Sequence, residues 1–350
     1  MPAARCGIAA QYAPAAVRAR PVEETQVSTK ARIATVCQGG RAGHSVEANR
    51  EYVMGLLHQA ATHKPDLVCL PESFNTVGVE LPGDGAEPLD GPTVSAFSQA
   101  AKANGCYVIC PIRTIEEGRV YNSAVVLGRD GLVAGVYHKA CPVTTSPDYT
   151  VFEGVTPGSS IPTFDLDFGR IGIQICFDIG FPRNWQALED AHAKLVFWPS
   201  AYDGGFPLRA YAYLHRYYVV SSTRAGRSRV VDPCGEVLAE TTDDEPVAVR
   251  DVNLDFMVCH WDFNMGVPDR IAQAYGDRVE VRHWDEGCAH FIIEPKDAGV
   301  TTAQLRDEIG VETAEEYYAR HITGYAAIHA GSPPLPQKAR HGARAQWGKE

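Results

Sequence analysis

Short apolar segments alternate with segments of helical periodicity along most of this chain. Residues 31–37 alternate apolar and polar positions, whereas residues 46–62 place apolar side chains three and four positions apart. The first spacing is typical of a strand with one buried face, and the second of an amphipathic helix. The same criteria predict strands at 67–70, 106–112, 121–128, 132–138, 169–175, 195–199, 218–223 and 247–254, a hairpin at 230–238, and weaker strands at 275–281 and 290–294. They predict further helices at 92–104, 182–190, 208–217 and 301–321.

The order of these elements predicts an α/β fold. Strands and helices alternate in the first half of the chain and again around residue 176, which indicates a sheet covered by helices. Residues 106–112 form a continuous apolar run, as expected of a strand that is buried on both faces. Periodicity alone does not say whether the strands form one sheet or two.

Both ends of the chain differ from its middle. Residues 1–29 are rich in Ala, Arg and Pro and have no periodicity, so we expect a disordered or loosely docked arm. We assign residues 30–300 to a single domain. Residues 301–350 are expected to form a C-terminal helix, capped by Thr301 or Thr302, and a basic tail.

Charge and cysteine content narrow the classes of function. The 350 residues carry a formal net charge of −11, which argues against a nucleic-acid partner because such proteins present a basic stripe. No apolar run reaches the roughly 18 residues that a membrane span requires. The ten cysteines are scattered and none has CxxC spacing, so we expect unpaired thiols, a cytoplasmic location and no metal.

Three reactive side chains stand at the ends of predicted strands. Glu72 follows an apolar strand and a proline, Lys139 ends a second strand, and Cys176 ends a third. Ligands of open α/β sheets bind at the carboxyl ends of the strands, so we expect these residues to share one site.

Cys176 lies between its strand and a helix that begins near Pro182. Such an elbow exposes a side chain and directs N–H groups toward it, which favours a thiolate and can stabilise an oxyanion. By itself Cys176 is equally well explained as a buried structural cysteine. Glu72 and Lys139, taken singly, would be explained as a solvated ion pair. The recurrence of all three at strand ends favours a catalytic site.

These motifs resemble those of the nitrilase, or carbon–nitrogen hydrolase, superfamily, whose catalytic Glu, Lys and Cys occur in this order and in these contexts. The resemblance extends over residues 30–255 and includes the block AKLVFWPSAY at 193–202. It implies a four-layer αββα sandwich, with two sheets inside and helices outside. It also implies that Glu72, Lys139 and Cys176 form the catalytic triad.

The residue types suit hydrolysis of an amide. A cysteine thiolate would attack the carbonyl carbon and form a thioester, which divides one difficult step into two. Glu72 would take the thiol proton, deliver it to the leaving nitrogen and then activate water. Lys139 and the backbone N–H of Phe177 would stabilise the oxyanion. We expect Tyr202 to contact the substrate, and we expect no cofactor.

Members of this superfamily usually have a fourth acid, a glutamate between the lysine and the cysteine. Spacing back from Phe152 selects Asp148 for this position. The aspartate side chain is one methylene shorter than that of the usual glutamate. Spacing from the turn at Pro157 selects Glu153, as in some aliphatic amidases. We favour Asp148 and keep Glu153 as the alternative.

The residues after the nucleophile look more like the amidase and N-carbamoyl hydrolase branches than like nitrilases proper, which usually have Cys-Trp-Glu where this chain has Cys176-Phe-Asp. N-carbamoyl hydrolases commonly place two arginines three and four residues later to bind a carboxylate, whereas this chain has Ile179 and Gly180. We therefore predict hydrolysis of a small amide, with a nitrile as the second choice and an N-carbamoyl compound as the third. An anionic substrate would need an arginine from elsewhere, such as Arg183, Arg209 or Arg224.

Three other functions compete with this prediction. A catalytically silent scaffold could share the fold, but the intact triad argues against it. A serine hydrolase of the α/β type would need a Gly-x-Ser-x-Gly elbow, which is absent. A zinc site would have to be built from residues that lack the usual spacing: Cys259, His260, His283, Cys288 and His290.

The resemblance also implies a homodimer or a higher homo-oligomer. In this superfamily the helix after the nucleophile lies on the surface that pairs two subunits. Trp185 and Leu188 lie three positions apart on that helix, so we expect them at a symmetric contact. The alternative is that Trp185 packs only against its own sheet.

Overall fold

A computed structural model describes residues 29–81, 85–145, 150–284 and 287–335 of the chain. Nearly all of the expected N-terminal arm and most of the expected tail therefore lie outside the described residues. Within these ranges, no helix combines the length and apolar character needed to cross a membrane. The nine cysteines in these ranges are free thiols.

The first of two six-stranded sheets carries α1 and α2 on its outer face. Strands β1, β2 and β3 are parallel neighbours in sequence order. The antiparallel pairs are β12 with β1, β4 with β3, and β5 with β4. In sheet order the strands are β12 (Val247–Asn253), β1 (Lys30–Val36), β2 (Leu67–Cys69), β3 (Tyr107–Glu116), β4 (Arg119–Leu127) and β5 (Val133–His138). The helices are α1 (Val46–Ala61) and α2 (Pro92–Asn104). α2 ends because Gly105 takes the left-handed conformation, with φ of +61°, that glycine adopts without strain.

The second sheet repeats this plan with α3 and α4 on its outer face. Its parallel strands are β7, β8 and β9, and the others are antiparallel. In sheet order the strands are β11 (Val237–Glu240), β10 (Arg229–Val231), β9 (Tyr218–Thr223), β8 (Leu195–Ser200), β7 (Gly169–Ile173) and β6 (Thr163–Leu166). The helices are α3 (Pro182–Asp190) and α4 (Gly205–His215).

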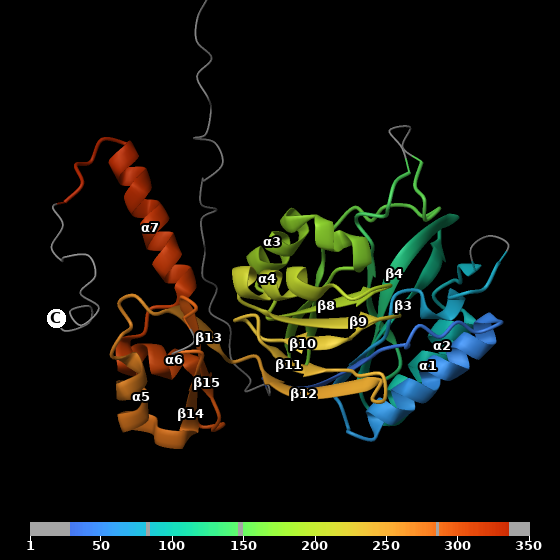
Figure 1. The fold of residues 1–350 in the computed structure, drawn as a ribbon, viewed down its shortest axis with the longest axis horizontal. Helices are drawn as coiled ribbons and strands as arrows, with labels where there is room; N and C mark the ends of the chain where they lie inside the picture. The colour runs from blue at the N-terminus through green and yellow to red at the C-terminus, as the bar shows by residue number, and fades with distance from the viewer. Residues whose placement is uncertain (1–28, 82–84, 146–149, 285–286, 336–350) are drawn as a thin grey trace, which may run out of the picture.

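The two sheets pack face to face and produce the predicted αββα sandwich (Figure 1). The central core joins inward side chains of both sheets, such as Ile33 and Leu67 with Ile173 and Phe197. Two outer cores separate each sheet from its own pair of helices. Successive side chains of a strand therefore point in turn toward the partner sheet and toward the helices.

Our expectation that Trp185 and Leu188 lie at a contact between subunits is wrong. Both side chains are fully buried inside the chain. The Trp185 ring stacks on Tyr211, with centroids 4.3 Å apart, and Leu188 covers Gly172, where an added Cβ would lie 2.7 Å from it. These residues hold α3 on its own sheet and are not available for a contact between subunits.

The C-terminal part forms a third, small sheet that sequence periodicity detected incompletely. Its strands, in the order β13-β15-β14, are β13 (Met257–His260), β15 (His290–Pro295) and β14 (Val279–Arg282). The prediction missed β6, β13 and α5 (Val267–Tyr275), and it placed the start of β14 inside α5.

The predicted C-terminal helix is divided into two parts. Thr301 caps α6 (Thr302–Leu305) as expected, but a π-helical segment at Arg306–Gly310 ends this part, and Thr313 caps α7 (Ala314–His329). The core of this region joins residues on both sides of the predicted boundary at residue 300, such as Met257 and Val311. The division of the chain into domains stays a prediction.

Candidate active site

Glu72, Lys139 and Cys176 follow β2, β5 and β7, so two come from the first sheet and one from the second. All three are buried, with 3%, 2% and 9% of their surface exposed. Both Glu72 and Lys139 change the pKa of the Cys176 thiol, which places the three side chains in one electrostatic environment. Burial of charged groups is costly unless they are paired, so this cluster requires a balanced set of partners.

Lys139 supplies the positive charge of the cluster. Its Nζ lies 3.0 Å from Glu72 Oε1 and 2.6 Å from Glu153 Oε1, so one ammonium group bridges two carboxylates. Burial alone would lower the pKa of Lys139, but Glu72, Cys176 and Glu153 outweigh it and raise this pKa above its ordinary value. Lys139 is therefore a fixed cation at neutral pH.

Glu153, our alternative for the fourth acid, occupies the position beside Lys139. Its Oε1 also accepts a hydrogen bond of 3.1 Å from the backbone N–H of Val143. Burial would raise the pKa of Glu153, but Lys139 and further hydrogen-bond donors lower it below its ordinary value. Asp148, which we favoured, lies outside the described residues.

Asn122 on β4 is a member of the cluster that the sequence analysis missed. Its Nδ2 donates hydrogen bonds of 2.9 Å to Glu72 Oε1 and 3.1 Å to Glu153 Oε2. One amide thus orients both carboxylates that contact Lys139. An asparagine within an apolar strand was the available signal, because a buried amide needs hydrogen-bond partners.

Asp178 fixes the elbow that carries Cys176. Its carboxylate accepts hydrogen bonds from the backbone N–H of Ile175 at 2.8 Å, from the Tyr137 hydroxyl at 2.7 Å and from the N–H of Cys141 at 2.8 Å. Tyr137 and Cys141 flank Lys139, so Asp178 ties the nucleophile elbow to the lysine. The motif around Cys176 contains Asp178 but gives no sign of this role, because both Tyr137 and Cys141 lie about 40 residues away in the chain.

The backbone at Cys176 is itself unusual. Its φ is +45°, a left-handed conformation that costs a non-glycine residue about 1–2 kcal/mol. The 3₁₀ turn at Cys176–Gly180 and a 3.0 Å hydrogen bond from Trp198 Nε1 to the Cys176 carbonyl maintain this conformation. Strain of this kind persists where the surroundings over-determine the backbone, as they commonly do at active sites.

The resting form of Cys176 is a neutral thiol. Burial and the Glu72 carboxylate raise the pKa of this thiol to about 11, against the opposing effects of Lys139, the Ala201 N–H and the Ser200 hydroxyl. The elbow was expected to favour a thiolate, but here burial is the larger effect. The nucleophile therefore needs a base to remove its proton, and Glu72 is the carboxylate beside it.

Phe177, the expected backbone donor to the oxyanion, and Tyr202, the expected substrate contact, both have exposed side chains. Phe177 directly follows Cys176 in the 3₁₀ turn, and its ring contacts Phe181 edge to face. Tyr202 packs edge to face on Trp198, and the nearby Cys176 contributes to the raised pKa of its hydroxyl, mainly a result of burial.

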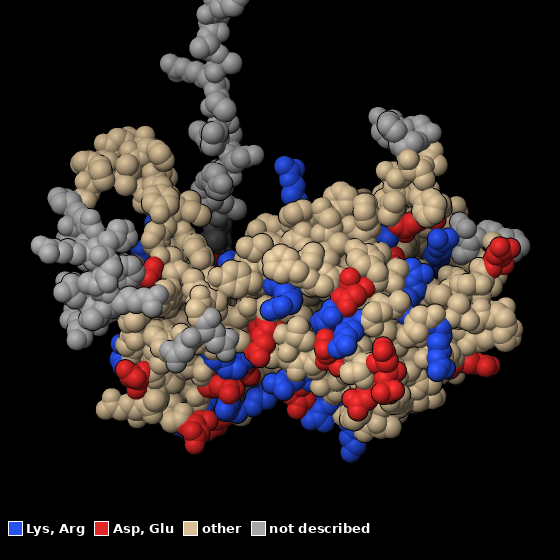
Figure 2. All heavy atoms as spheres, viewed as in Figure 1, with Lys and Arg blue, Asp and Glu red and all other residues tan. Residues whose placement is uncertain are grey.

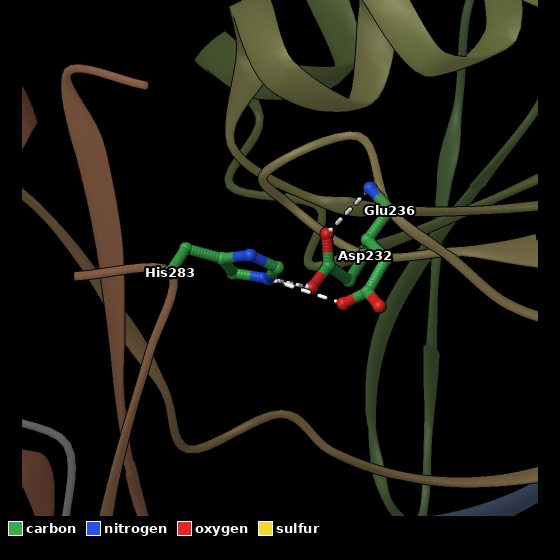
Figure 3. Close-up of side chains that lie close together, drawn as sticks. All are labelled: Asp232, Glu236 and His283. Atoms are coloured by element: carbon green, nitrogen blue, oxygen red, sulfur yellow. Dashed lines mark hydrogen bonds and ion pairs between the residues drawn. The ribbon is translucent and has the colours of Figure 1, made fainter. Parts of the chain in front are cut away.

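Asp232, Glu236 and His283 place three possible metal ligands within 4.8 Å of one another (Figure 3). However, Asp232 Oδ1 accepts hydrogen bonds from two backbone N–H groups, and Oδ2 lies 2.7 Å from His283 Nε2 and 2.8 Å from Arg282 Nη1. A cation would have to compete with the guanidinium for the same oxygen. These residues fit an ion network that joins the second sheet to the C-terminal sheet, and they do not fit a metal site.

Comparisons with known proteins show the family to which this chain belongs. The family model for carbon-nitrogen hydrolases matches residues 33–258, which is more than half of the chain. Omega-amidase NIT2 of Bos taurus is 30% identical over 223 residues, covering 57% of this chain and 81% of that protein. The human omega-amidase NIT2 is 29% identical over 221 residues, covering 57% and 80%.

Solved structures show the same fold at lower sequence identity. Saccharomyces cerevisiae Nit3, a member of the nitrilase superfamily, superposes with a TM-score of 0.57 at 22% identity, covering 72% of this chain and 96% of that one. An amidase from Nesterenkonia sp. gives a TM-score of 0.54 at 20% identity, covering 64% and 90%. With its αββα sandwich and its match to the family model, this chain belongs to the carbon–nitrogen hydrolase family of the nitrilase superfamily, hydrolases that act on carbon–nitrogen bonds other than peptide bonds.

Proposed function

We propose that this protein hydrolyses a small amide through a thioester on Cys176 and releases a carboxylic acid and ammonia or an amine. The observation that carries the proposal is the lysine bridge: Lys139 lies between Glu72 and Glu153 in a buried site beside a neutral thiol. A buried thiol next to a carboxylate and a fixed cation has the groups that acyl transfer requires.

In the first half of the reaction, Glu72 takes the proton of Cys176 as sulfur attacks the carbonyl carbon. The oxyanion that forms is stabilised by Lys139 and the backbone N–H of Phe177. When the tetrahedral intermediate collapses, the carbon–nitrogen bond breaks, and Glu72 gives its proton to the leaving nitrogen.

In the second half, water replaces the amine. Glu72 removes a proton from water, the oxygen attacks the thioester, and the acid leaves as the thiol regains its proton. Glu153 holds Lys139 and, with Asn122, keeps Glu72 in position. The sum is amide plus water giving acid plus amine, with no change in oxidation state.

Nitriles and N-carbamoyl compounds remain the second and third candidates. The omega-amidase relatives favour an amide. A matched panel of an amide, its nitrile and its N-carbamoyl analogue, assayed for ammonia release with mass-spectrometric trapping of the acyl-enzyme, tests the choice. A trapped adduct on Cys176 with faster turnover of the amide supports the proposal. A scaffold without activity would give no adduct and no turnover.

We also propose a homodimer built across α3 and α4. In the view of Figure 2, the surface over α3, α4 and α7 carries few charged side chains, whereas charges of both signs gather below it. Phe181, directly before α3, is exposed, as are Phe206 and Leu214 on α4, and Phe206 is 77% exposed. Phe206→Glu should convert a dimer to a monomer in sedimentation analysis. A wild-type protein that is monomeric at micromolar concentration would contradict this proposal.

A further inference from the structure

Ser200 lies at the carboxyl end of β8, beside the strand that leads to Cys176. β7 and β8 are parallel neighbours in which Ile173 pairs with Phe197, and the N–H of Gln174 continues this ladder with a 3.0 Å hydrogen bond to the Phe197 carbonyl. Cys176 and Ser200 each come three residues after the last pair, so they leave the sheet at the same level. Because neighbouring strands are about 4.8 Å apart, Ser200 is a neighbour of the nucleophile.

The end of β8 contacts both the backbone and the side chain of Cys176. Trp198 Nε1 donates a 3.0 Å hydrogen bond to the Cys176 carbonyl. The Ser200 hydroxyl and the backbone N–H of Ala201 donate hydrogen bonds to the Cys176 sulfur. Residues 198–201 therefore hold the nucleophile at two points, and two donors are directed at its reactive atom.

The hydroxyl of Ser200 is oriented by a second hydrogen bond. The side chain is fully buried, and its Oγ accepts a 3.1 Å hydrogen bond from the backbone N–H of Tyr202. A hydroxyl carries one proton and two lone pairs. Because a backbone donor occupies the oxygen, the proton of the Ser200 hydroxyl is directed to the sulfur, which satisfies a group that would be costly to bury without a partner.

The need for such a donor follows from the charges around the sulfur. Burial and the Glu72 carboxylate raise the pKa of the Cys176 thiol, whereas Lys139 and the two donors of the β8 end lower it. The charge of Lys139 is shared between two carboxylates, Glu72 and Glu153. A hydrogen bond to a charged atom is worth more than one to a neutral atom, so the donors contribute most when the thiol has lost its proton.

We propose that Ser200 is a further catalytic residue, whose hydroxyl stabilises the negative charge that develops on the Cys176 sulfur. Ser200 keeps its own proton throughout. Glu72 takes the thiol proton as the carbon–sulfur bond forms, and this proton goes to the leaving nitrogen as the carbon–nitrogen bond breaks. When water hydrolyses the thioester, the carbon–sulfur bond breaks and the same hydroxyl stabilises the leaving sulfur. This inference rests on the proposed amide hydrolysis and adds a residue to it.

The test measures the reactivity of the sulfur directly. Iodoacetamide alkylates thiolates, and peptide mass spectrometry follows the reaction at Cys176 alone among the ten cysteines. Ser200→Ala should slow this alkylation roughly 10- to 100-fold near pH 8, the scale of losing a hydrogen bond to a charged group. Ser200→Thr retains a hydroxyl and should recover at least part of the rate.

Ser221→Ala is the matched control, because it also removes a buried hydroxyl from the second sheet. Ser221 lies on β9, and its Oγ accepts a 2.9 Å hydrogen bond from the N–H of Arg229. This variant should leave the alkylation rate of Cys176 unchanged. Urea unfolding of each variant verifies that it is folded, and Ser200→Gly, which also lacks the hydroxyl, should reproduce the slower alkylation of Ser200→Ala.

The pH dependence of alkylation separates the proposed role from a structural one. Loss of a donor to the thiolate should shift the midpoint of the alkylation profile to higher pH in Ser200→Ala. Glu72, Lys139 and Tyr202, the titratable side chains around the sulfur, are present in both proteins and do not account for such a difference. If Ser200 serves only to hold the N–H of Tyr202, its replacement would lower the urea midpoint but change neither the rate nor the profile, which would overturn the proposal.

Alkylation also separates this proposal from the proposed reaction, because it involves no amide. If the wild type hydrolyses no amide but alkylation depends on the Ser200 hydroxyl, the donor role stands and the reaction is wrong. If the wild type hydrolyses an amide and Ser200→Ala keeps both its kcat and its alkylation rate, the reaction stands and the role of Ser200 is wrong. When both are correct, Ser200→Ala lowers kcat and leaves KM unchanged.

Discussion

Replacement of Lys139 by Met tests the centre of the site, because it removes one charge on which two buried carboxylates depend. The ammonium lies 3.0 Å from Glu72 and 2.6 Å from Glu153, whose side chains are 4% and 14% exposed. Removing one member of a buried ion pair costs about 3–5 kcal/mol. Asn122 still donates to both carboxylates and Arg224 still faces Glu72, so we expect a loss of unfolding free energy near 3 kcal/mol.

The loss should depend on pH with a definite sign. Lys139 helps to hold the pKa of Glu153 below its ordinary value, so the wild type gains stability above the unfolded-state pKa of this carboxyl and loses it as pH falls through the folded pKa. The variant lacks this contribution. Urea unfolding should therefore show a large difference near pH 7 and a smaller one below about pH 4.

The double variant Lys139→Met/Glu153→Gln separates stability from catalysis. It removes one of the two carboxylates left without a cation, so it should recover part of the lost unfolding free energy. It should not recover activity, because the oxyanion still lacks its positive partner, and we expect kcat to remain roughly 10²- to 10³-fold below wild type. Lys102→Met is the control, an exposed lysine at the end of α2.

Two results would refute this reasoning. If Lys139→Met raised KM but left kcat unchanged, Lys139 would be a binding residue and not a partner of the oxyanion. If Lys102→Met destabilised the protein as much as Lys139→Met does, the cost would not come from the buried carboxylates.

Three further predictions concern single residues. Cys176→Ala should abolish ammonia release and the acyl-enzyme mass shift, and its urea unfolding should stay close to that of the wild type. More than trace turnover would contradict the assignment of Cys176 as the nucleophile. Cys176→Ser should also be nearly inactive, because Glu72 is too weak a base for a hydroxyl, and substantial turnover would mean that this proton transfer is not limiting. Asp232→Asn should lower the free energy of unfolding by about 1.5–3 kcal/mol near pH 7, the scale of a hydrogen bond to a charged group, because Arg282 keeps Glu294 and His283 keeps Glu236. An unchanged urea midpoint would show that Asp232 contributes no stability through this network.

The sequence by itself determined the elements and the three reactive residues. Local periodicity predicted most strands and helices of both sheets, because each has one side facing an apolar core and therefore a regular pattern. Glu72, Lys139 and Cys176 were found because each directly follows such a pattern. The family and its αββα fold were inferred from these same short motifs, and the comparisons confirmed them.

Tertiary structure decided what these residues contact. Asp148 lies outside the described residues, whereas Glu153 lies 2.6 Å from Lys139, a contact between distant segments that local spacing does not reveal. Trp185 was expected at a subunit contact, but its burial depends on Tyr211 in the next helix.

The same limit applies to residues outside the motifs. Asn122 and Arg224 approach Glu72 from positions 50 and more residues away in the chain. Sequence periodicity reports which face of an element is buried, whereas hydrogen bonds and ion pairs form between elements that only packing brings together. The sequence thus determined which residues can carry the chemistry, and the tertiary structure decided their hydrogen-bond partners, their burial and their charge states.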